Sequence, residues 1–183
     1  MIGLIIVGVI VLVLIIAIWS IYNGLVAAQN IVEEAFSGID VQLKKRYELI
    51  PNLIEAVKGY NAHEANTLQK IVEDRSRTND VQGMAKQDQS ITSTLKNFRI
   101  QVEAYPDLQA NTQFLKLMDN LSTVENELAM ARRYYNGATR DYNTKMEVFP
   151  AVLFAKSFGH SQAEFYEIDE AQKATPVVDL TNK

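Results

Sequence analysis

The chain has 183 residues, a net charge of −4 and no cysteine. A chain of this length holds one ordinary domain, and its acidic balance argues against nucleic acid as a partner. The absence of cysteine excludes disulfides, thiolate catalysis and cysteine metal sites.

The N-terminal segment is apolar throughout. Residues 1–19 contain only aliphatic residues, glycine, one methionine and one tryptophan. A helix of that length extends about 28 Å, which matches the hydrocarbon thickness of a bilayer. Trp19 and Tyr22 close the segment with rings that favour the headgroup level. We predict a transmembrane anchor at residues 1–22 that contacts the lipid bilayer and is retained, because no basic residue precedes it as in a signal peptide.

The side of the membrane that holds the soluble domain is not fixed by charge. The positive-inside rule counts Lys and Arg within about 15–20 residues of the span. The first basic residue after the anchor is Lys44, which is too distant, so the rule does not choose an orientation.

An amphipathic helix follows from Asn23. Its apolar positions recur every three or four residues, as in helical bundles and coiled coils: Leu25, Ala28, Val32, Ala35, Ile39, Leu43, Tyr47, Ile50, Ile54 and Val57. Pro51 interrupts this pattern without shifting it, and either a kink or a chain reversal would fit. The helical pattern then continues to about residue 77.

Turn-forming residues at 78–83 separate this helix from two later ones. The second helix ends near Pro106, a residue that suits the first turn of a new helix. The third spans 108–149 and is followed by a short apolar stretch, 149–158. We predict an all-α fold in which the transmembrane helix precedes an antiparallel bundle of three to four long helices at residues 23–159. Residues 160–183 form an acidic C-terminal tail.

No constellation of catalytic or metal-binding residues is evident. His63-Glu64 begins like a zinc-protease helix, but Thr67 occupies the position of the second histidine. No Glu has a His three residues later, as two-metal bundles require, and there is neither a phosphate-binding glycine loop nor a nucleophile elbow. We therefore expect no cofactor, no metal and no enzymatic activity.

Two sets of residues are candidates for interactions. The first is basic and consists of Lys44, Lys45, Arg46, Arg132 and Arg133. These side chains would either form surface salt links or contact lipid headgroups or an acidic partner. The second set is aromatic and includes Tyr135, Tyr142, Phe149, Phe154 and Phe158. Core packing is the default for such rings, but the stretch 149–158 must be buried in the bundle, in another copy or at the lipid interface.

Several segments resemble the LemA family of bacterial membrane proteins. They are Tyr22-Asn23-Gly24-Leu25-Val26, the run 34–53 that ends in Leu49-Ile50-Pro51-Asn52-Leu53, Val57-Lys58-Gly59-Tyr60, His63-Glu64, the run 103–108 around Tyr105-Pro106-Asp107, Ala131-Arg132-Arg133-Tyr134-Tyr135-Asn136, Tyr142-Asn143 and Phe149-Pro150. The resemblance implies a single N-terminal membrane helix, a compact antiparallel bundle and a place in the bacterial inner membrane. It implies no catalytic residues.

These observations favour a membrane-anchored scaffold or adaptor that acts through protein contacts or self-assembly. The alternative is a membrane-remodelling or lipid-binding module that uses the basic clusters and the stretch 149–158. We also expect a homo-oligomer, because the third helix would be about 60 Å long and the second only about half of that. The contacts between copies would lie around Tyr135, Tyr142 and Phe149, with Arg132 and Arg133 at the rim. We also expect further membrane proteins as partners.

Overall fold

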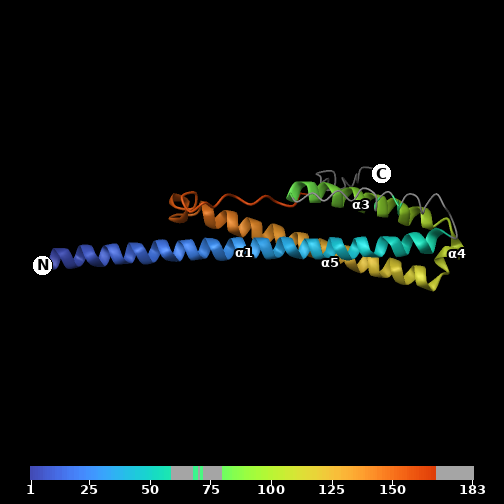
Figure 1. Cartoon of the computed structure of the whole chain (residues 1–183), viewed down its shortest axis with the longest axis horizontal. Helices are drawn as coiled ribbons and strands as arrows, with labels where there is room; N and C mark the ends of the chain where they lie inside the picture. The colour runs from blue at the N-terminus through green and yellow to red at the C-terminus, as the bar shows by residue number, and fades with distance from the viewer. Residues whose placement is uncertain (59–67, 70, 72–79, 168–183) are drawn as a thin grey trace, which may run out of the picture. The chain divides into compact units, whose positions relative to one another are not determined.

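The computed structural model describes residues 1–58, 68, 69, 71 and 80–167 (Figure 1). The helices in these ranges are α1 (Ile2–Lys58), α3 (Val81–Val102), α4 (Pro106–Gln109) and α5 (Thr112–Glu147), with a short 3-10 helix, η1 (Ala151–Leu153). The described residues contain no strand, and α5 runs antiparallel to α1. The all-α antiparallel fold is therefore confirmed. The helix predicted to continue to residue 77 lies mostly outside the described residues.

Helix α1 joins the apolar N-terminal segment directly to the amphipathic region. Pro51 lies inside α1, so the alternative of a chain reversal at this proline is wrong. Among the described residues, α1 alone is long and apolar enough to cross a membrane. Residues 1–17 are exposed, whereas the predicted seam from Leu25 to Leu43 is buried. The change in burial along one continuous helix separates the apolar segment from the packed one.

The chain divides into two compact units, and α1 and α5 contribute to both. Unit 1 comprises Met1–Gln42 and Glu127–Phe165. Its core lies between the two helices, where Tyr135 and Tyr142 of α5 are buried. After η1 the chain returns along α5 without helical structure. Asn143 binds this returning segment at Ala163: its side chain donates to the Ala163 carbonyl at 3.0 Å and accepts from the Ala163 amide at 2.9 Å.

Unit 2 comprises Leu43–Asn126 and Tyr166–Lys183. Its core is a cluster of aliphatic and aromatic side chains that includes Ile50, Leu53, Leu68, Phe98, Leu108 and Phe114. Helix α3 begins where Asp80 accepts a hydrogen bond from the amide of Gly83 at 2.9 Å, which satisfies one of the free amides of the first turn. The break predicted at 78–83 is therefore wrong at residues 81–83, which belong to α3, and its residues 78 and 79 lie outside the described residues.

The long third helix differs from its prediction at both ends. Pro106 begins the short helix α4, as its fixed backbone angle favours. The chain then breaks at Asn111, whose side-chain oxygen accepts from the amides of Gln113 at 2.9 Å and Phe114 at 3.2 Å. This asparagine caps α5, so the helix starts later than the apolar periodicity predicts. It ends at Glu147, before the cis peptide bond between Phe149 and Pro150.

Candidate functional site

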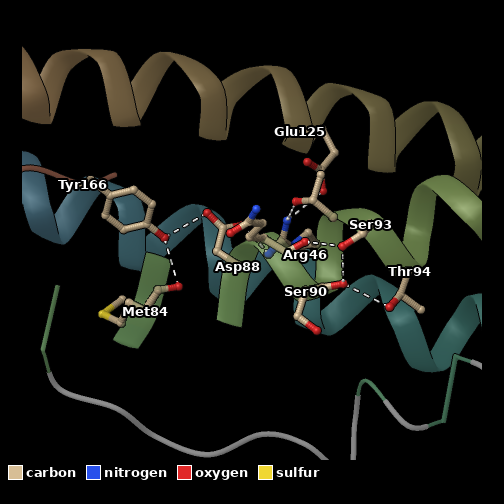
Figure 2. A network of polar contacts seen from close by, with 10 residues as sticks. Arg46, Met84, Asp88, Ser90, Ser93, Thr94, Glu125 and Tyr166 are labelled. Atoms are coloured by element: carbon tan, nitrogen blue, oxygen red, sulfur yellow. Dashed lines mark hydrogen bonds and ion pairs between the residues drawn. The ribbon is translucent and has the colours of Figure 1, made fainter. Parts of the chain in front are cut away.

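Unit 2 encloses a group of charged side chains in its interior (Figure 2). Arg46 of α1 is 0% exposed and Asp88 of α3 is 1% exposed. The guanidinium donates to Asp88 Oδ1 at 2.7 Å, to Glu125 Oε1 at 3.0 Å and to Thr92 Oγ1 at 3.1 Å. One arginine from α1 thus links α3 and α5 at a single point.

Tyr166 extends this network to the segment that follows unit 1. Its hydroxyl donates to Asp88 Oδ2 at 2.8 Å and lies 3.2 Å from the carbonyl oxygen of Met84. Figure 2 shows the tyrosine ring beside Asp88, on the side away from Glu125. Both oxygens of the Asp88 carboxylate are therefore occupied, one by a cation and one by a phenol. Each oxygen of this buried carboxylate thus has a hydrogen-bond donor, as buried polar groups require.

The two carboxylates determine the ionisation of Arg46. Burial alone would lower the pKa of the guanidinium, because it disfavours the charged form. The charges of Asp88 and Glu125, together with their hydrogen bonds, outweigh that effect and raise the pKa above its ordinary value. The cation is permanent, and its Nη1 and Nη2 atoms are paired with partners in its own unit, whereas the buried Nε has no hydrogen-bond partner. The network has the properties of a structural clamp.

The basic cluster predicted at residues 44–46 is thereby corrected. Lys44 and Lys45 are exposed, but Arg46 points into the core and is not available to a lipid or an acidic partner. In the second cluster Arg133 is exposed, and Arg132 is half-buried. The two clusters place fewer charges on the surface than the sequence suggests.

Tyr135 and Tyr142 are also buried, so they cannot form the predicted contact between copies. The Tyr135 hydroxyl donates to the carbonyl of Glu164 at 2.8 Å, and its ring centroid lies 5.7 Å from that of Phe36. The Tyr142 hydroxyl shares a hydrogen bond of 3.1 Å with Nδ1 of His160. Burial raises the pKa of both phenols, and for Tyr142 the nearby charge of Glu33 adds to this effect. These rings hold the returning chain against the helices of unit 1.

A different face of α5 presents interface-type side chains to solvent. Met130, Arg133 and Tyr134 are exposed and lie three and four residues apart, which places them on one side of the helix. Met130 is 54% and Tyr134 is 56% exposed. Met, Tyr and Arg are enriched in protein interfaces relative to other surface. Met130 and Tyr134 are not among the predicted interaction residues, although their helical phase, opposite to the buried Leu128 and Tyr135, indicates exposure.

The aromatic residues that follow α5 differ in burial. Phe149 is 79% exposed, whereas Phe154 and Phe158 are half-buried and stack with their ring centroids 6.2 Å apart. Phe158 meets the Tyr22 ring of α1 edge-on at 5.3 Å. This segment, residues 148–158, is called the apolar loop below.

The described part of the chain holds no group of three or more His, Asp or Glu side chains arranged for a metal ion. His160 has one buried nitrogen, Nε2, with no hydrogen-bond partner, while its other nitrogen is bonded to Tyr142. The nearby ring of Tyr22 accounts for the apolar environment of this histidine. The arrangement supports packing rather than proton transfer or coordination.

Comparison with known proteins identifies a family. The model of the LemA family matches residues 35–180 of the chain. A curated relative, Protein LemA of Metamycoplasma hominis, is 25% identical over 155 residues, which cover 82% of this chain and 71% of the relative. The family match includes α3, α4 and α5 in full and α1 from Ala35 onward.

Proposed function

We propose, from the premise that this chain belongs to the LemA family, that it is a membrane-anchored helical scaffold. In this proposal α1 holds the protein in the bacterial cell membrane, and the soluble part acts by binding proteins, including further copies of itself. We assign it no chemistry of its own.

The continuity of α1 supports the anchoring role. A helix connects the exposed apolar residues 1–17 to the buried seam that begins at Leu25, without an intervening loop. The anchor therefore enters the packed region as a stiff element, because every residue between them is helical. Such a connection suits a protein that must hold a binding face close to a membrane surface.

The observation that carries the proposal is the exposed face formed by Met130, Arg133 and Tyr134 on α5. Tyr and Arg are enriched among the few residues that dominate the binding energy of interfaces, and Met is enriched in interfaces as a whole. The two apolar side chains lie one turn apart, so a partner can cover both at once. Arg133 beside them offers donors for a carboxylate of the partner.

Self-association is the part of this proposal that we favour first. Copies anchored in one membrane plane meet at a raised effective concentration, so that a small contact suffices. In this proposal Arg132 lies at the rim and Arg133 within the contact, and Met130 and Tyr134 replace Tyr135 and Tyr142 as the contact residues.

Site-specific photocrosslinking tests this function. A benzophenone amino acid replaces Tyr134 in the full-length chain, and irradiation of intact membranes should give adducts that include a dimer of the chain. The matched control places the same group at Thr123, an exposed position on the same helix. Equal labelling at the two positions, or no adduct at Tyr134, would remove the support for this interface.

Light scattering provides the complementary measurement. Detergent-purified full-length protein should have the mass of an oligomer at micromolar concentration, and Met130→Glu with Tyr134→Glu should reduce it to a monomer. A monomeric mass for the unaltered chain would contradict self-association. Crosslinking to other proteins alone would then leave the adaptor role.

A lipid-binding function remains the alternative, and one observation favours it. The basic clusters contribute less than expected because Arg46 is buried. The apolar loop, in contrast, presents large apolar side chains to solvent. If vesicles bind a chain that lacks the anchor, and binding weakens with salt, this alternative gains over the scaffold.

A further inference from the structure

The apolar loop lies beside the part of α1 that leaves the membrane. Ring contacts fix it there, because Phe158 packs against Tyr22 at 5.3 Å and the ring of His160 lies 6.4 Å from that of Tyr22. Within unit 1, Figure 1 shows the orange-to-red loop alongside the blue part of α1.

The burial of α1 shows how far the loop reaches. Every residue of α1 up to Ala17 is exposed, and Ile18 and Ile21 are the first that become half-buried. Trp19 remains 67% exposed. Trp and Tyr at the end of a transmembrane span favour the headgroup level. The loop therefore covers α1 at the level where the span meets water.

The outer side of the apolar loop has no cover in its own unit. Val148, Phe149, Val152 and Leu153 are exposed, and Leu153 reaches 63%. Lys145 and Lys156 lie on either side of these four residues in the sequence and are also exposed. Apolar side chains bordered by lysines are typical of segments that enter the headgroup region, where the amines contact phosphates and the apolar groups enter the acyl boundary.

We propose that the apolar loop inserts into the interface of the same bilayer that α1 spans and forms a second membrane contact of this chain. The occupant of the exposed apolar surface is lipid, because the loop is continuous with the span through the contacts of Tyr22 and Phe158. A loop at the headgroup level is surrounded by lipid, so a second copy would have to displace that lipid in order to bind there. The contact fixes the rotation of α1 about its own axis relative to the membrane; it rests on the proposed anchoring by α1 but not on the scaffold role.

The absence of cysteine makes a direct test possible. Phe149→Cys and Leu153→Cys are made separately in the full-length chain, labelled with the environment-sensitive fluorophore NBD and reconstituted into phosphatidylcholine–phosphatidylglycerol vesicles. Asp141→Cys, an exposed position on α5 in the same unit, is the matched control. Emission is compared with and without lipids that carry a doxyl quencher near the headgroup, and with aqueous iodide.

At both loop positions we expect blue-shifted emission, quenching by the doxyl lipids and protection from iodide, with none of these at position 141. Unshifted emission and quenching by iodide at both loop positions would overturn the proposal. A blue shift without doxyl quenching would also overturn it, because the label would then be covered by protein. Comparison of circular dichroism spectra confirms that each labelled chain keeps its fold.

Discussion

Arg46 and Asp88 are charged residues at core positions of their helices. Arg46 lies between the buried Leu43 and Ile50 on α1, and Asp88 lies between the buried Ala85 and Ile91 on α3. Each charge would be costly alone, since neither can reach water. Their 2.7 Å contact makes the burial tolerable and couples the register of α1 to that of α3.

Removal of Arg46 should therefore destabilise the protein strongly. Arg46→Met keeps the volume and the helix propensity but leaves the Asp88 carboxylate buried without its cation. We expect a loss of about 3–5 kcal/mol in the free energy of unfolding, measured by urea denaturation followed by circular dichroism. Lys44→Met, an exposed change two residues away, should alter stability by less than about 0.5 kcal/mol.

The double variant Arg46→Met with Asp88→Asn separates charge from packing. Asn keeps an acceptor for the Tyr166 hydroxyl and carries no charge, so part of the loss should be recovered. If the double variant is no more stable than Arg46→Met, an unpaired buried charge is not the cause of the destabilisation.

Sequence periodicity predicts the core of α1 well but misplaces this residue. The three-or-four spacing admits Arg46 or Tyr47 between Leu43 and Ile50, and apolar character favours Tyr47, which is half-buried. Arg46 takes the core position because its ion-pair partner, Asp88, occupies a buried seam position on α3. Opposite charges on the seams of two helices are a signal of a buried pair, but the pairing itself requires the three-dimensional register.

The buried tyrosines of unit 1 predict a loss of stability at alkaline pH. The pKa of Tyr135 and of Tyr142 is raised in the folded chain above the ordinary value of about 10. The unfolded chain therefore loses these protons first, and it binds fewer protons than the folded chain. The stabilisation is complete below about pH 10 and is lost as pH rises towards the folded values.

Tyr135→Phe with Tyr142→Phe tests this dependence. The double variant should be less stable at neutral pH, because two hydrogen bonds are lost, but its melting temperature should fall less steeply above about pH 10. Tyr134→Phe, an exposed change, should leave the slope as it is. Identical slopes for all three chains would exclude these two phenols as the source.

At the scale of elements, helix capping determines where a helix begins, which apolar periodicity does not fix. Apolar spacing predicts one helix from 108 to 149, whereas the chain forms α4 and α5 with a break at Asn111. The break follows from the preference of Asn for the N-cap position, where its side chain satisfies amides of the first turn. Asn111 is thus a sequence signal for the start of α5 that the apolar spacing alone does not reveal. Pro106 is a direct signal for the start of α4.

Pro51 is the clearest element-scale test. It lies in the interior of α1 and is exposed, so it lacks the amide that would bond to the preceding turn and makes no core contact. Pro51→Ala should stabilise the chain by about 1–3 kcal/mol, the lower value allowing for the greater freedom of the unfolded chain. The measurement is urea denaturation of the full-length protein in detergent. Asn52→Ala, also exposed, should change stability by less than about 0.7 kcal/mol, and a destabilised Pro51→Ala chain would contradict this account.

For the whole chain, the boundary between anchor and packed protein can be defined by burial. Composition predicts an anchor at residues 1–22, because the polar sequence begins at Asn23. Contacts in unit 1 give a different limit, since Ile18 and Ile21 are half-buried and Tyr22 packs on Phe158. The last turn of the predicted membrane span thus also takes part in the packing of unit 1.

Two truncations distinguish these roles. Removal of residues 1–17 deletes only exposed side chains and should leave a folded helical chain with the melting temperature of the full-length protein. Removal of residues 1–22 also deletes the Tyr22 contacts, and an aromatic pair of this kind contributes about 0.5–1.5 kcal/mol. The shorter chain should therefore still fold, as the seam from Leu25 supplies a core, but it should melt at a lower temperature. Circular dichroism on both chains is the measurement. Equal melting temperatures would show that the loop gains nothing from Tyr22, and an unfolded chain after removal of residues 1–17 would show that the soluble part depends on the membrane segment for its fold.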